Sequence, residues 1–101
     1  MEKNYEISNA EWVAILGERF RDYRIAMQLT QRDVAEQAGV SLPTIRHFEH
    51  GSAVNLSLST LVALLRTIHL LENIEQLLPP LPQDPMQIYN HQTTKPQRVR
   101  K

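Results

Sequence analysis

The chain has 101 residues, with 11 basic and 11 acidic side chains, a formal net charge of zero and no cysteine. This length suits one domain with a short extension, and the missing cysteines exclude disulfide bonds, thiolate zinc sites and a cysteine nucleophile. The N-terminal MEKNYEISN lacks the layout of a signal peptide, and no apolar run approaches the roughly 18 residues of a membrane span. We therefore expect a soluble, cytoplasmic protein without membrane contact.

The charges are unevenly distributed along the chain. Residues 1–29 carry five acids against four bases, whereas residues 79–101 carry four bases against one acid. Because the field of a phosphate group is felt only within about a Debye length, ~10 Å, local charge matters more than the sum. A net charge of zero therefore does not exclude a nucleic-acid partner.

Four predicted helix starts share the same local chemistry. A hydroxyl side chain precedes each helix as an N-cap, and apolar residues on either side of it form a hydrophobic staple. The four caps are Ser8, Thr30, Ser41 and Ser57. Glu11 completes a capping box with the first cap, and Asp33 holds the corresponding position after the second. These signals predict an all-α fold.

The first helix carries an apolar stripe at three- and four-residue steps, which we expect to be buried. The stripe consists of Trp12, Ile15, Leu16, Phe20, Tyr23 and Met27. Arg19, Arg21 and Arg24 lie mostly off it, so we expect them on a solvated face. The alternative is that one of these arginines contacts a phosphate.

Residues 30–51, TQRDVAEQAGVSLPTIRHFEHG, form the most informative stretch. Ala35 stands where two short helices approach most closely, and Gly39 and Gly51 supply the left-handed conformation that ends each helix. The side chains expected to face inward are Val34, Ala38, Val40, Ile45 and Phe48. Together these features predict a helix-turn-helix, whose second helix enters the DNA major groove.

The C-terminal part is predicted to contain two more helices and a tail. A leucine-rich helix over residues 58–71 and a short helix over residues 72–78 end at the prolines that follow. So dense an aliphatic surface is expected to be buried partly in the core and partly against a second subunit; the alternative is that all of it is core. The predicted dimer contacts are Leu70, Leu71, Ile74 and Leu77. The tail over residues 79–101 is proline-rich, then basic, and predicted to be flexible.

Residues 16–78 resemble the XRE-like family of bacterial and phage regulators, which includes the repressors of the lambda/434 Cro type. The resemblance rests on LTQRDVAEQAGVS, on TIRHFEHG and on the leucine-rich helix behind them. It implies a five-helix lambda-repressor-like DNA-binding domain over residues 8–78, followed by the flexible tail. It also implies a repressor that binds a palindromic double-stranded operator as a homodimer.

The resemblance further implies which residues contact DNA. Gln31 would fix a helix end to a phosphate, and the residues nearer the DNA backbone would be Arg32, Ser41 and Thr44. The residues facing the bases would be Leu42, Pro43, Arg46 and His47. Many family members carry glutamine at the first two of these positions. Leucine and proline offer only apolar contact there, for instance to a thymine methyl group.

Hydrogen-bonded readout then depends on Arg46 and His47. Arg46 is suited to bidentate pairing with guanine, a contact worth about 1–3 kcal/mol. Its alternatives are a phosphate contact or an intrahelical pair with Glu49 or His50. For His47 the alternatives to a base contact are a phosphate contact and simple exposure.

No catalytic site, metal or cofactor is expected. The sequence HFEH brings together His47, Glu49 and His50, but the carboxylate is offset from both histidines and a third ligand is missing. The serines are assigned to helix caps rather than to nucleophilic catalysis.

The layout is also similar to that of the HipB-type antitoxins, in the leucine-rich fourth helix and the spacer PPLPQDPM with a basic end. That similarity implies a HipA-type kinase toxin as partner and repression of a shared operon. One alternative is a stand-alone phage-type or restriction-system regulator. Another is a protein-binding scaffold with weak DNA binding, which the zero net charge and the apolar Leu42 and Pro43 would fit.

Overall fold

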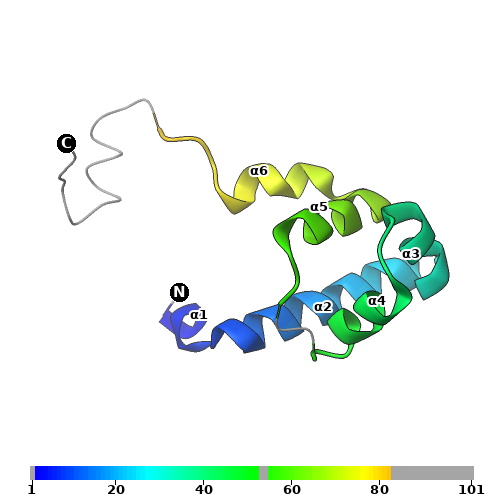
Figure 1. Ribbon diagram of the computed structural model, residues 1–101. Helices are drawn as coiled ribbons and strands as arrows, with labels where there is room; N and C mark the ends of the chain where they lie inside the picture. Colours follow the sequence, from blue (N-terminus) through cyan, green and yellow to red (C-terminus); the bar gives the residue numbers. More distant parts are fainter. Residues whose placement is uncertain (1, 53–54, 83–101) are drawn as a thin grey trace.

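A computed structural model describes residues 2–52 and 55–82, and within these residues the chain is all-helical and forms no strand. The elements are α1 (Glu2–Glu6), α2 (Asn9–Ala26), α3 (Gln31–Ala38), α4 (Leu42–Glu49), α5 (Leu58–Thr67), the 3₁₀ turn η1 (Leu71–Asn73) and α6 (Ile74–Leu77). The long α2 underlies the bundle, with α3 near its C-terminal end and α5 above it (Figure 1). The predicted all-α class is confirmed. The tail prediction falls mostly on residues 83–101, which lie outside the described residues.

The four long helices begin at the predicted caps. The hydroxyl groups of Ser8, Thr30, Ser41 and Ser57 each accept a hydrogen bond from the main-chain N–H three residues on, at 2.9–3.3 Å. Glu11 and Asp33 accept in return from the main-chain N–H of the cap, which completes two capping boxes. The hydrogen bond from the main chain of Thr30 is the chief reason why the pKa of Asp33 lies below its ordinary value.

The core is built by four helices and the residue that caps α5. Its buried apolar side chains are Phe20, Val34, Ile45, Phe48, Leu64 and Ile68. The rings of Phe20 and Phe48 lie 5.7 Å apart, centroid to centroid, at an interplanar angle of 42°. Ala38 and Val40 pack against this cluster. The predicted inward face of the helix-turn-helix is therefore confirmed.

Gly17 sets how closely α2 and α4 approach. A Cβ atom at this position would lie 1.8 Å from the main-chain oxygen of Phe48, which is far inside contact distance. A glycine within a helix costs about 1 kcal/mol relative to alanine. Here the packing requires it, because only glycine lets the two helix backbones meet. The sequence prediction gave Gly17 no role.

The predicted helix over residues 58–71 is too long, since α5 ends at Thr67. His69 has a φ of 60°, its N–H donates to the carbonyl of Arg66, and the N–H of Leu70 donates to that of Leu65. This is a Schellman ending, whose left-handed position is usually a glycine. A histidine there gives no stop signal in the sequence. The predicted helix over 72–78 is divided between η1 and α6, which together cover residues 71–77.

Three predictions about α2 are wrong. Leu16 and Tyr23 were expected to be buried but are 40% and 48% exposed, because they border a groove that no described element fills. Arg24 was expected on a solvated face but is buried.

The short α1 was not predicted. The indole N–H of Trp12 donates to the carbonyl of Asn4 at 3.2 Å and holds α1 against the start of α2.

We predict that Gly17→Ala lowers the free energy of unfolding by about 3 kcal/mol, because the added methyl group drives α2 away from α4. Urea denaturation followed by circular dichroism measures this loss. The matched control is Gly39→Ala, where φ is +69° and nothing lies within 4 Å of the added Cβ. Only backbone strain of about 1–2 kcal/mol is expected there. A loss for Gly17→Ala no larger than that of the control would contradict the packing explanation.

Candidate nucleic-acid interface

One face of α4 is turned outward while the opposite face is fixed in the core. Its exposed residues, spaced at i, i+3, i+4 and i+7, are Pro43, Arg46, His47 and the C-cap residue His50. Residues at this spacing share one side of a helix. The inward face consists of Ile45, Phe48 and Glu49, all buried. The helix is therefore fixed by its inward face and presents an exposed edge of one proline, one arginine and two histidines.

The predicted base-facing residues are not all equally placed. Pro43, Arg46 and His47 lie together on the exposed face, whereas Leu42 is partly buried in the first turn. His50 shares the exposed face, although it was considered only as a metal ligand or as a partner of Arg46. The helical spacing of His50 from Arg46 and His47 places it on this face, because residues three and four positions apart share one side of a helix.

The residues predicted to lie nearer the DNA backbone flank this face. Ser41 is exposed and caps α4, and its Oγ lies 2.8 Å from the Oγ1 of Thr44. Arg32 is exposed in the first turn of α3, and Gln31 is partly buried beside it. The starts of α3 and α4 thus carry hydroxyl, amide and guanidinium groups, which are common partners of phosphate oxygens.

A polar hollow of about 410 Å³ adjoins α4 on the side of α5. It is lined by Thr44, His47, Ser52, Asn55, Leu56, Ser57 and Thr60. The Ser52 hydroxyl donates to the main-chain oxygen of His47 at 3.3 Å, which ties the following loop to α4. The sequence pattern does not indicate Ser52, Asn55 and Thr60, because only the fold brings them beside the helix.

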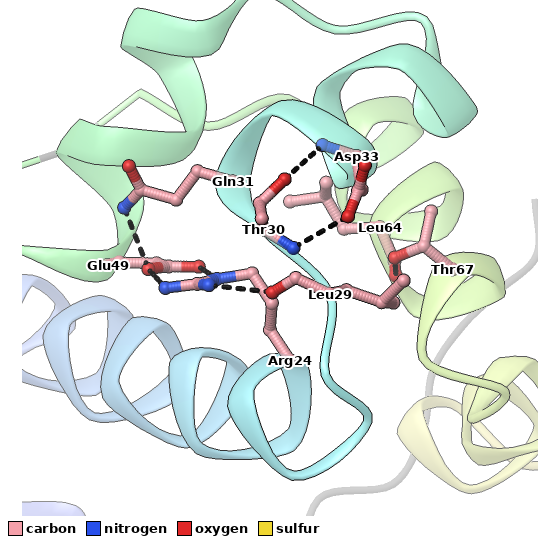
Figure 2. A network of polar contacts seen from close by, with 8 residues as sticks. All are labelled: Arg24, Leu29, Thr30, Gln31, Asp33, Glu49, Leu64 and Thr67. Atoms are coloured by element: carbon pink, nitrogen blue, oxygen red, sulfur yellow. Dashed lines mark hydrogen bonds and ion pairs between the residues drawn. The ribbon is translucent and has the colours of Figure 1, made fainter.

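A buried ion pair attaches the end of α4 to α2. Arg24 donates from Nε to Oε2 of Glu49 at 2.7 Å and from Nη2 to Oε1 at 2.8 Å (Figure 2). Its Nη1 donates to the main-chain oxygen of Leu29 at 2.9 Å. The hydrogen bond to Glu49 is the chief reason why the pKa of Arg24 is raised above its ordinary value. Such a bidentate arrangement is among the strongest hydrogen-bonded contacts in proteins.

Gln31 extends this network to α3. Its Nε2 donates to Oε1 of Glu49 at 3.0 Å, so that one carboxylate connects three helices (Figure 2). One amide hydrogen of Gln31 is thereby used. The predicted phosphate contact of Gln31 then depends on its second amide hydrogen or on its main-chain N–H, which lies in the first helical turn, where N–H groups have no intrahelical acceptor.

The ion-pair network excludes one of the alternatives considered for Arg46 on the outer face of α4. Glu49 faces inward to Arg24, so the intrahelical pair between Arg46 and Glu49 is not formed. Within residues 2–52 and 55–82, no three histidine, aspartate or glutamate side chains gather as metal ligands. In the helix-turn-helix, Glu49 is paired internally with Arg24, while Asp33 and Glu36 of α3 keep their charges. The outer face of α4 therefore carries Arg46 and two histidines without an acidic residue of its own helix.

The comparisons with known proteins agree with this geometry. A family model described as a helix-turn-helix domain matches residues 15–76, which is more than half of the chain. The matched range begins in α2 and ends in α6, and it includes the core and the ion-pair network. A search of curated proteins gave no match. Within the part of the chain that the structure describes, no helix has the length and apolar character needed to span a membrane.

We predict that Glu49→Gln lowers the free energy of unfolding by about 3 kcal/mol, because it leaves the guanidinium of Arg24 buried without its counter-charge. The matched control is Glu36→Gln on the exposed surface of α3, for which the change should stay within about 0.5 kcal/mol. Urea denaturation of both variants measures the difference. The double variant Arg24→Met/Glu49→Met should recover part of the loss, since neither charge is then left unpaired. A double variant less stable than Glu49→Gln would contradict this account.

Proposed function

The chain belongs to the family of helix-turn-helix domains, and we propose that it is a sequence-specific transcriptional repressor that binds double-stranded DNA as a homodimer. The observation that carries the proposal is the outward face of α4, with Pro43, Arg46, His47 and His50 on one side of a helix whose other side is locked into the core. A rigid helix with a free polar edge is what major-groove readout requires.

In this proposal Arg46 is the main reader of base identity. Its guanidinium is exposed and is not engaged by Glu49, so both of its terminal nitrogens are free to pair with O6 and N7 of guanine. His47, one position further along, supplies a second polar contact. Pro43 and the edge of Leu42 contact thymine methyl groups. Because few groups here hydrogen-bond to bases, DNA shape contributes to specificity.

The flanking residues hold the helix on the DNA backbone. Gln31 and Arg32 at the start of α3, and Ser41 and Thr44 at the start of α4, are proposed to contact phosphates on either side of the groove. The hollow beside α4 widens this surface with hydroxyl and amide groups. Phosphate contacts of this kind fix register and orientation, while the outer face of α4 supplies selectivity.

The homodimer is proposed to form through the C-terminal helical region. Leu70, Leu71 and Ile74 are only partly buried and Leu77 is 60% exposed, so apolar surface is left for a second subunit. A two-fold axis there would present two α4 helices to successive major grooves, about 34–36 Å apart, on a palindromic operator. The domain responsible is proposed to span residues 8–78.

We also propose that the chain is the antitoxin of a toxin–antitoxin operon and binds a HipA-type kinase toxin. The support is the similarity of its layout to HipB-type antitoxins, together with the exposed Leu77, Leu78 and Leu81, which follow α5 in the chain. Co-purification of such a kinase from the native host would support this role. Isolation of the chain without one would favour a stand-alone phage-type or restriction-system regulator. Weak, sequence-independent DNA binding would favour a scaffold.

We predict that Arg46→Ala weakens binding to an operator selected from random duplexes by about 10- to 100-fold at constant salt. It should also relax the preference at the base pair that Arg46 reads. Fluorescence anisotropy with the operator and with single-base variants measures both effects.

The matched control for this prediction is Arg66→Ala. It removes one exposed positive charge from α5, at a residue that lines neither the groove between α2 and α5 nor the hollow beside α4. Base preference should be unchanged in this variant. Operator binding by Arg46→Ala as tight as that of the parent would rule out the assigned role of Arg46.

A further inference from the structure

An apolar groove runs between α2 and the side formed by α5, η1 and α6. Its larger part encloses about 280 Å³ and its smaller part about 160 Å³. The two parts share Leu16, Phe48 and Leu61, so they lie next to each other. No residue of the outward face of α4 lines either part. The groove is therefore separate from the proposed DNA-reading surface.

The exposed apolar surface of the described residues concentrates at this groove and at the segment that follows α6. Of the eight large apolar side chains that are exposed, four border the groove: Leu16, Tyr23, Leu58 and Leu77. Two more, Leu78 and Leu81, follow directly along the chain, at 86% and 66% exposure. Contiguous apolar surface of this kind marks interaction sites. The exposed apolar side chains of the groove and of the segment are therefore adjacent, since Leu77 borders the groove and Leu78 follows it directly.

The segment over residues 78–82, LPPLP, is suited in shape to such a groove. Proline fixes φ, and proline-rich segments favour the polyproline II conformation with three residues per turn. Leu78 and Leu81 then project from the same edge, about 9 Å apart at 3.1 Å per residue. Preformed segments of this type dock into grooves lined with aromatic side chains. Of the aromatic residues at this groove, Tyr23 is 48% exposed and available for contact, whereas Phe20 and Phe48 are buried beneath it and most of the remaining lining is aliphatic.

The segment does not fill the groove of its own chain. Both leucines are exposed, and the chain leaves the helices after α6 (Figure 1). Pro79 and Pro80 follow at once and restrict the sharp reversal that a return to the same groove would need. In a two-fold dimer each segment can meet the groove of the other copy, so that no groove and no segment stays uncovered.

We infer that the groove between α2 and α5 receives Leu78 and Leu81 from a second copy of this chain, in a reciprocal exchange. The inference rests on the proposed homodimer and adds contacts beyond Leu70, Leu71, Ile74 and Leu77. It does not depend on how α4 reads DNA. Self-association without DNA is therefore the property to measure.

Two variants of the full chain separate the two halves of the contact. The segment variant Leu78→Asp/Leu81→Asp and the groove variant Leu16→Glu should each weaken self-association in sedimentation equilibrium. For the segment variant the loss should be about 10,000-fold, since each dimer loses four buried leucines and each accounts for about tenfold or more. The matched control Ile25→Glu changes an exposed apolar residue of α2 outside the groove and should self-associate like the parent. All replaced side chains are at least 40% exposed, so thermal unfolding should show folded variants.

Mixing the two variants tests whether the exchange occurs between chains. The segment variant keeps an intact groove and the groove variant keeps an intact segment, so a mixed dimer regains one of the two contacts. Fluorescently labelled segment variant should therefore associate with the groove variant more tightly than either associates with itself. An equal lack of association in the mixture would overturn the exchange.

The remaining outcomes distinguish this inference from the proposed function. A segment variant that dimerises like the parent would overturn the exchange and leave the homodimer standing. A parent that is monomeric at every concentration would overturn both the exchange and the homodimer. Base readout by Arg46 is measured separately on DNA and would be unaffected by either result.

Discussion

The carboxylate of Glu49 is the contact on which the arrangement of the helix-turn-helix depends. It accepts two hydrogen bonds from Arg24 of α2 and one from Gln31 of α3, and it belongs to the last residue of α4. A buried charge is tolerated only when it is paired and fully hydrogen-bonded. The three helices therefore have one arrangement that satisfies it, and the glycine at position 17 lets α2 and α4 come close enough to adopt that arrangement.

This inward attachment determines what α4 can offer on its outer side. Since Glu49 is turned inward, it does not neutralise Arg46, and the outer face of α4 carries this positive charge without an acidic residue of its own helix. The apolar groove between α2 and α5 shares none of the residues of that face. In the proposed regulator, α4 reads DNA while the groove and the leucines after α6 hold the two subunits together. Substitutions on the outer face of α4 should therefore affect DNA reading, and substitutions in the groove or the following leucines should affect subunit association.

Local signals in the sequence predicted the starts of four helices and the helix-turn-helix correctly. Caps, the turn at Gly39 and the inward residues of α3 and α4 follow from short-range hydrogen bonding and helical periodicity. Contacts between distant residues were missed: Arg24 and Glu49 are 25 positions apart and each resembles an ordinary surface charge. The helix end at His69 was missed because it lacks glycine, and periodicity placed Leu16 in the core because it cannot distinguish a filled interface from an open groove.

The salt dependence of operator binding is the decisive measurement of whether a chain with no net charge binds DNA through Arg32 of α3 and the outer face of α4. The affinity for the selected operator would be measured by anisotropy at several salt concentrations. Neutralisation of phosphates by Arg32 and by the residues of α4 in two subunits predicts a linear fall of log affinity against log salt, with a slope of about −2 or steeper. A slope near zero would mean that few phosphates are neutralised, and would contradict the account.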